Sequence, residues 1–231
     1  MFALSPEEWQ VVLLSLQVSG AAIVLTMPLA FALAYLLARG RFPGRLLVDA
    51  LVHLPLVLPP VVTGYLLLLS FGRRGLFGSF LADVFGIVLS FRWTGAALAC
   101  GIMSFPLLVR PIRLSIEAVD PRLEEAAGTL GASRVWVFLT VLLPLILPGI
   151  IAGAVLAFAK AMGEFGATIT FVSNIPGQTQ TLPSAIYSFL QVPGGDSQAF
   201  RLVLVSIFVA MAALVLSEWV SRAVARRVSG T

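Results

Sequence analysis

Long apolar runs, separated by short stretches that carry most of the arginines, dominate this 231-residue chain. A helix needs about 20 mainly apolar residues to cross a bilayer. Five stretches qualify, at about residues 11–38, 46–71, 94–113, 135–161 and 202–222. Charged residues make up 11% of the chain, whereas they make up roughly a quarter of a soluble domain. We therefore predict an all-α polytopic membrane protein with five transmembrane helices in a single domain.

Closely spaced prolines should distort the second and the fourth of the five stretches. Pro59 and Pro60, with Pro55 before them, interrupt the second stretch, and the backbone groups they free cannot be satisfied by lipid. This broken span must face protein or water. Pro144 and Pro148 lie one turn apart in the fourth stretch, which should kink where it leaves the cytoplasmic side.

Shorter segments follow the second and fourth stretches. Glycines and an aspartate interrupt the apolar segment 76–89, which we expect at the outer interface of the membrane. Gly163 to Gly166 breaks the helix after the fourth stretch, and one short helix is expected near residues 183–190.

The arginines predict the orientation in the membrane. Segments 39–45, 110–134 and 222–227 together hold ten basic residues, and the alternate side of the membrane holds five. Cytoplasmic loops carry an excess of Lys and Arg. The N-terminus is therefore expected outside and the C-terminus in the cytoplasm, with the loop 120–134 on the cytoplasmic side.

That loop has the signals of a short, well-bounded helix. Asp120 is a good N-cap, Pro121 suits the first helical position, and Gly131 suits the residue past a helix end. In a helix over residues 121–130, four apolar residues fall at positions i, i+3, i+4 and i+7 and form one stripe: Leu123, Ala126, Ala127 and Leu130. A stripe with such small side chains is shaped for close docking on another protein, or it lies on the chain's own spans or the lipid headgroups.

The loop resembles a known signature. Glu125-Ala126-Ala127, then Gly131, then Val141-x-Leu143-Pro144 is similar to the cytoplasmic loop of permease subunits of ABC importers, which usually has isoleucine where Val141 stands. Further segments are similar to permeases of bacterial molybdate ABC importers: 54–60, 72–75, 104–110, 147–153 and 163–177. The start of the last segment is shared in part with sulfate importers, and its extension through residues 174–177 favours molybdate.

The resemblance implies a type I ABC importer permease fold with a cytoplasmic coupling helix, in the bacterial inner membrane. It implies a homodimer, two copies of a separate ABC ATPase subunit, and a periplasmic molybdate-binding protein. The residues that the resemblance assigns to ATPase coupling are Leu123, Glu125, Ala126, Ala127, Leu130 and Gly131. Nothing in the resemblance implies a cofactor, a nucleic-acid partner or catalysis by this chain.

The residues themselves offer little chemistry. His53 is the single histidine, so a multi-histidine metal site cannot be built, and Asp49 is its expected partner one turn earlier. The chain has no P-loop motif. We therefore predict no catalytic or metal site, and any ATP must be hydrolysed by another chain.

Two sets of charges remain as candidates. Lys160 and Glu164 should pair or face water near the outer mouth, with hydroxyl donors for an anion nearby at Thr168, Thr170 and Ser173. Alternatively, Lys160 is an interfacial lysine that snorkels out of the lipid. Arg73 and Arg74 are expected to help dock the binding protein or, alternatively, are simply solvated.

Three alternative functions remain open. The chain could serve a sulfate or thiosulfate importer, or a tungstate importer. In a different class, an ion-gradient-driven secondary anion transporter predicts internal repeats and paired intramembrane carboxylates. Neither internal repeats nor paired carboxylates are evident in the sequence, where Glu164 stands alone at membrane depth.

Overall fold

The structure, a computed structural model, describes residues 4–229, and the side chains at 217 and 220–229 lie outside that description. Every regular element in the described residues is helical, as predicted. In chain order the elements are α1 (Pro6–Arg39), α2 (Arg45–Val57), α3 (Pro60–Phe71), α4 (Leu76–Phe85), α5 (Trp93–Ala118), α6 (Pro121–Thr129), α7 (Arg134–Val137), η1 (Phe138–Leu142), α8 (Leu143–Met162), α9 (Gly166–Val172), α10 (Leu182–Leu190) and α11 (Asp196–Ser229).

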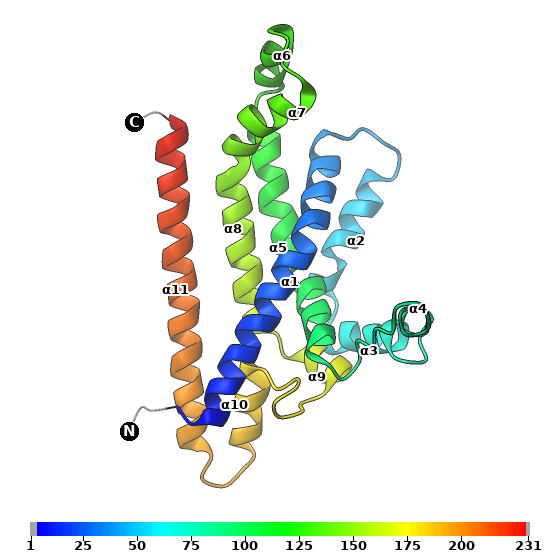
Figure 1. Ribbon diagram of the computed structural model, residues 1–231, viewed down its shortest axis with the longest axis vertical. Helices are drawn as coiled ribbons and strands as arrows, with labels where there is room; N and C mark the ends of the chain where they lie inside the picture. The colour runs from blue at the N-terminus through cyan, green and yellow to red at the C-terminus, as the bar shows by residue number, and fades with distance from the viewer. Residues whose placement is uncertain (1–3, 230–231) are drawn as a thin grey trace.

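Four helical runs among the described residues are long and apolar enough to cross a membrane. They are α1, α5, the run from α7 through α8, and α11 to Leu216. The pair α2 and α3 is a fifth candidate if it is counted as one span, although the two helices are bent by 112°. In Figure 1 the long helices run side by side, while α3 and α4 lie across them near one end.

The prolines explain the break between α2 and α3. Because residues 59 and 60 have no N–H, the carbonyl groups of Pro55 and Leu56 cannot receive the usual helical hydrogen bonds. After the bend, α3 lies directly on α9. A Cβ atom added to Gly64 would stand 2.5 Å from the carbonyl oxygen of Ala167, so only glycine permits this close approach.

The expected irregularity of the fourth span lies just before its first proline. A π-helical turn, η1, occupies Phe138–Leu142 and leads into α8, where Pro144 is the second residue. A wider turn accommodates a proline ring that would clash with the carbonyl four residues earlier. Pro148 lies inside the continuous helix α8.

Helix α5 is the centre of the molecule and packs against α1 and α8. In the apolar 18-residue stretch of α5, 67% of the residues are buried, against 11% in that of α11. A buried apolar cluster joins the three central helices, with Leu37, Leu108, Ile112 and Ile146 among its members. The sparsely buried faces of the other helices must be covered by lipid or by other subunits.

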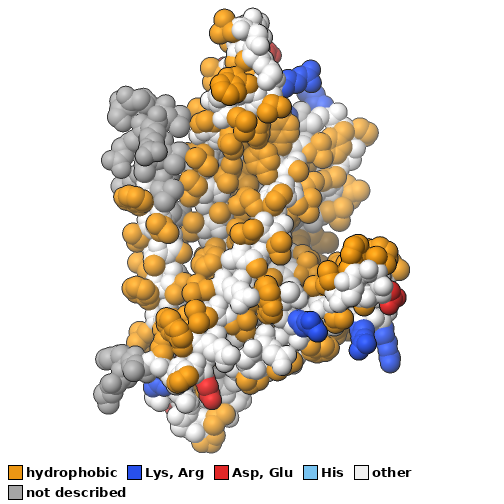
Figure 2. Space-filling model, in the orientation of Figure 1, with side chains coloured by type: hydrophobic (Ala, Val, Ile, Leu, Met, Phe, Trp, Pro, Cys, Tyr) orange, Lys and Arg blue, Asp and Glu red, His pale blue; other side chains and the backbone are white. Residues whose placement is uncertain are grey.

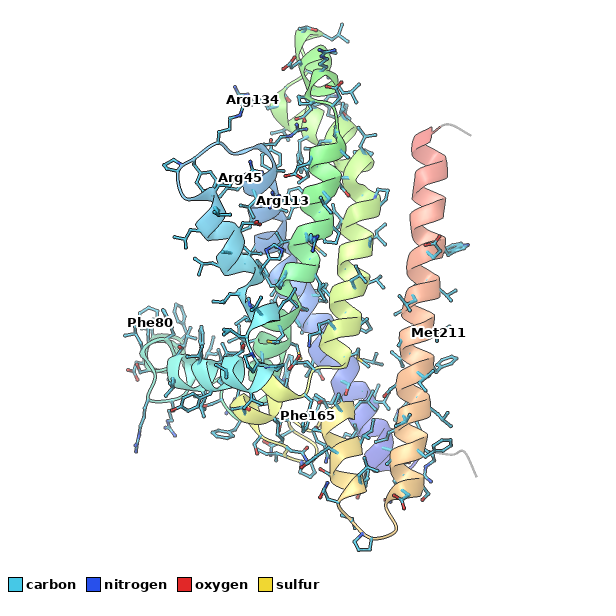
Figure 3. All side chains as sticks on the ribbon, turned by 180° about the vertical axis from the view of Figure 1, so that it is seen from behind. Arg45, Phe80, Arg113, Arg134, Phe165 and Met211 are labelled. Atoms are coloured by element: carbon cyan, nitrogen blue, oxygen red, sulfur yellow. The ribbon has the colours of Figure 1, made fainter. Side chains whose placement is uncertain are left out.

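The two ends of the molecule differ. Helix α6 and the C-terminal end of α11 lie at one end, and the start of α1 and α10 lie at the other, with α4 to one side, closer to the α10 end than to α6 (Figure 1). Arg45, Arg113 and Arg134 all lie toward the α6 end (Figure 3). The membrane orientation stays a prediction, and the side chains of residues 222–227, on which it partly rests, lie outside the described ones.

Candidate functional site

The short helix α6 projects beyond the long helices and is capped at both ends. The Asp120 carboxylate accepts a hydrogen bond from the backbone N–H of Arg122 at 3.0 Å, and Pro121 opens the helix. At the other end Gly131 has a φ of +89°. Its N–H donates to the carbonyl of Gly128, and the N–H of Ala132 donates to that of Ala127. This pair of bonds is a Schellman motif, in which glycine is favoured.

None of the α6 residues, all of which the structure describes, is buried. Leu123 is 50% exposed and Leu130 is 89% exposed. The two leucines of the stripe therefore keep half or more of their surface free of contacts within the chain. Val135 and Trp136, which open the next helix, are also 69% and 62% exposed. Apolar side chains are visible at this tip of the molecule in Figure 2.

We call Leu123, Ala126, Ala127, Leu130, Val135 and Trp136 the tip surface. Sequence reasoning identified the first four, but it assigned Val135 and Trp136 to the span that begins there, because both are apolar. Aromatic residues such as tryptophan are enriched at protein interfaces. The tip surface can bury apolar area against a partner without any rearrangement of the long helices.

An ion-pair network surrounds the neighbouring helix ends. Arg113 donates to the Asp49 carboxylate at 2.7 Å and to the Glu117 carboxylate at 2.8 Å, and Arg45 donates to Glu117 at 3.3 Å. His53 was expected to pair with Asp49, and it does. Its Nδ1 atom lies 2.8 Å from the Asp49 carbonyl oxygen and 3.6 Å from the Asp49 carboxylate, for which Arg113 is the closer partner.

At the other end, Lys160 and Glu164 form an ion pair of 2.6 Å where α8 gives way to α9. The Glu164 side chain is 1% exposed and also accepts from the backbone N–H of Ala167 at 3.0 Å. The Lys160 side chain is 31% exposed. Lys160 thus pairs with a buried carboxylate one turn later in the chain. Because its own side chain is partly exposed, it can also attract an anion.

The expected hydroxyl donors are mostly engaged elsewhere. Thr168 is 2% exposed and donates to the carbonyl of Phe165, and Thr170 donates to that of Gly166. Neither hydroxyl is free in this conformation to donate to an anion, because Ser and Thr side chains in a helix bond readily to the preceding turn. Ser173 is exposed, with a φ of +64°.

Arg73 and Arg74 are both exposed in the turn between α3 and α4. Neither forms an ion pair with any part of the chain that the structure describes. They border a shallow cavity that Leu68, Val88 and Phe91 also line. The two cations are therefore available to an acidic partner at the end opposite α6. In the described residues, no cluster of three or more His, Cys, Asp or Glu side chains could hold a metal ion.

Comparisons with known proteins agree on one family. The model of the binding-protein-dependent transport system inner membrane component matches residues 27–230. The chain is 60% identical over 219 residues to the molybdenum transport system permease protein ModB of Escherichia coli (strain K12), covering 95% of this chain and 96% of the relative. It is 54% identical over 209 residues to the protein of the same name from Haemophilus influenzae, with 90% and 91% coverage.

A sulfate transport system permease protein, CysT of Salmonella typhimurium, is 43% identical over 159 residues, which are 69% of this chain and 57% of the relative. Among solved structures, a bacterial ABC transporter that imports the polysaccharide alginate matches with a TM-score of 0.70 at 19% identity, covering 96% of this chain and 80% of that chain. The MetNI methionine ABC transporter in an inward-facing conformation matches with a TM-score of 0.66 at 15% identity and 94% coverage of both chains.

Proposed function

The chain belongs to the family of binding-protein-dependent transport system inner membrane components, and on that premise we propose that it is the membrane-spanning permease subunit of an ATP-driven ABC importer for molybdate. The high identity to molybdenum permeases over nearly the full length supports molybdate as the cargo. The lower identity to a sulfate permease over a shorter stretch makes sulfate the weaker candidate. The relatives are transport permeases, and this chain's task is transport.

The observation that carries the proposal is α6. It is an ordered helix with both ends capped, and its apolar stripe is exposed. Such a helix fits a groove on a separate ATPase, where Ala126 and Ala127 allow close approach and Leu123 and Leu130 fill pockets. Glu125, which is exposed on the same helix, adds a charge that can select the partner.

The connections of α6 suit the transfer of motion. Two extended residues, Val119 and Asp120, join it to α5, and α7 and η1 join it to α8. When ATP closes two ATPase subunits, α6 of each permease copy moves with its ATPase, and the central helices α5 and α8 follow. Two copies of the chain would thereby open the pathway alternately to the two sides of the membrane.

At the outer end, a periplasmic molybdate-binding protein delivers the anion. Arg73 and Arg74 supply positive charge that favours association with an acidic surface. In the pathway, the partly exposed Lys160 attracts the dianion, while Glu164 tempers its charge so that the anion is released again. This arrangement places the N-terminus outside and α6 in the cytoplasm of a bacterial cell, with the chain in the inner membrane.

The test is reconstitution of the chain with its ATPase in proteoliposomes, with the binding protein and labelled molybdate outside and ATP inside. We expect molybdate uptake that needs ATP and the binding protein and stops with vanadate. Competition with sulfate and tungstate identifies the preferred anion. Uptake that needs an ion gradient and no ATP would instead indicate a secondary transporter and would contradict the proposal.

A further inference from the structure

The junction between α5 and α6 is bridged by an arginine from a distant part of the sequence. Arg39, the last residue of α1, donates from Nη2 to the carbonyl oxygen of Val119 at 3.1 Å and to the Glu124 carboxylate at 2.8 Å. Val119 precedes the helix α6 and Glu124 lies within its first turn. One guanidinium therefore holds both sides of the junction.

This bridge matters because little else fixes the angle of α6. Val119 and Asp120 are both extended, so rotation about their backbone bonds would swing the helix. The helix buries no residue, and it packs mainly on α7 and η1. Arg39 and Glu124 are only 23% and 27% exposed, so the pair is partly shielded from the solvent that weakens surface ion pairs.

Helix α1 is also held at its far end. The Arg201 guanidinium at the start of α11 donates to the Glu8 carboxylate at 2.6 Å, and Glu8 is 1% exposed. The Ser15 hydroxyl oxygen accepts from the backbone N–H of Leu182 in α10 at 2.7 Å. A single long helix thus connects the α5–α6 junction with the elements at the opposite end.

We propose that Arg39 is a positioning residue that clamps the α5–α6 junction through Val119 and Glu124, so that α6 moves with α1 and α5 as one body. Without this clamp α6 pivots about the junction, and part of the motion imposed on it does not reach the long helices. The proposal rests on the proposed function for its transport consequence, but the clamp itself is a property of the isolated chain.

The first experiment therefore uses the chain alone in lipid nanodiscs. Hydrogen exchange of the α6 amides should speed up about tenfold in Arg39→Ala, since hydrogen bonds to a charged group are lost. Arg45→Ala is the matched control, because the ion pair of Arg45 near the same end is with Glu117 of α5 and not with α6. Exchange that is unchanged in Arg39→Ala, or raised equally in Arg45→Ala, overturns the clamp whether or not the chain transports molybdate.

The second experiment measures molybdate imported per ATP hydrolysed in the reconstituted complex. Arg39→Ala should lower this ratio several-fold while ATPase activity stimulated by the binding protein persists, and the double variant Arg39→Glu with Glu124→Arg should recover part of it. A merely structural role would lower uptake and ATP hydrolysis together. If wild-type protein imports no molybdate with ATP, the proposed function fails and the exchange result still decides the clamp.

A reversible cross-link tests the one-body motion directly. The native Cys100 is the single cysteine of the chain and is buried, so cysteines placed at 39 and 124 can be joined selectively by a short cleavable linker. Because Arg39→Cys and Glu124→Cys remove the ion pair, we expect little molybdate imported per ATP hydrolysed before cross-linking and a higher ratio while the linker joins the two positions. Transport that stops on cross-linking and returns on cleavage would show that α1 and α6 must separate in each cycle, and the proposal would be wrong.

Discussion

Replacing Gly131 by alanine should loosen α6 through backbone conformation alone. Gly131 has a φ of +89°, and a Cβ atom there would meet nothing within 4 Å. A non-glycine residue in the left-handed region costs about 1–2 kcal/mol. Because 1.4 kcal/mol corresponds to a factor of about ten, the population of α6 opened at its C-terminal end should rise roughly 5- to 30-fold.

A helix of nine residues is sensitive to such a change. Isolated helices shorter than about 12 residues are marginal in water, and no residue of α6 is fully buried in this chain. Its order depends on the Asp120 cap, on Pro121 and on the two hydrogen bonds around Gly131. The loss of one of these should therefore be visible locally while the long helices remain intact.

Gly128→Ala is the matched control. Gly128 lies inside α6, and a Cβ atom there would also meet nothing within 4 Å. Alanine is favoured over glycine in a helix by about 1 kcal/mol, so this variant should order α6 more. The same glycine-to-alanine change, three residues apart, should thus have opposite effects.

The assay is hydrogen exchange of the α6 amides in nanodiscs, followed by the affinity for the ATPase. Exchange should accelerate in Gly131→Ala and slow in Gly128→Ala, and ATPase affinity should fall in the former. Gly131→Asn should lie between wild type and Gly131→Ala, since asparagine tolerates the left-handed region better. Equal effects of the two alanine variants would refute the assignment of a left-handed C-terminal cap to Gly131.

Three further variants test the remaining site residues. Ala127→Trp should overfill the docked stripe at a cost of about 1–3 kcal/mol, measured as at least a several-fold loss of ATPase binding with normal membrane insertion; normal assembly would argue against docking. Replacing Arg73 and Arg74 by alanine should weaken binding-protein stimulation at low salt more than at high salt, and equal affinity at both salts would indicate solvated arginines. Lys160→Ala leaves Glu164 buried and unpaired, a cost of about 3 kcal/mol for a largely buried pair, and should slow molybdate flux, whereas Lys160→Arg should preserve it; normal flux in Lys160→Ala would remove the role of this pair.

Local features of the chain were predictable because they rest on near neighbours. The caps of α6 follow from Asp120, Pro121 and Gly131, each of which acts within one turn. The Lys160–Glu164 pair has helical spacing, so periodicity alone suggested it. The break at Pro59 and Pro60 follows from the missing N–H groups.

Features that depend on distant residues could not be predicted in this way. The hydrophobic periodicity of the sequence does not predict the direction of the 112° bend between α2 and α3. That direction is set by the packing of α3 on α9. The pairs Arg39–Glu124 and Arg201–Glu8 join residues 85 and 193 positions apart. The donor role expected for Thr168 and Thr170 stays a prediction, and composition does not reveal that both hydroxyls donate to backbone carbonyls in this conformation.

The central claim is that a separate ATPase docks on α6, and a photo-crosslinker at position 127 tests it most directly. The measurement uses proteoliposomes that import molybdate, with Gln178, an exposed residue in the loop before α10, as the control position. We expect an adduct with the ATPase from position 127, a yield that changes with ATP, and no ATPase adduct from position 178. Adducts from position 127 with lipid or the permease alone, in vesicles that still import molybdate, would contradict the account.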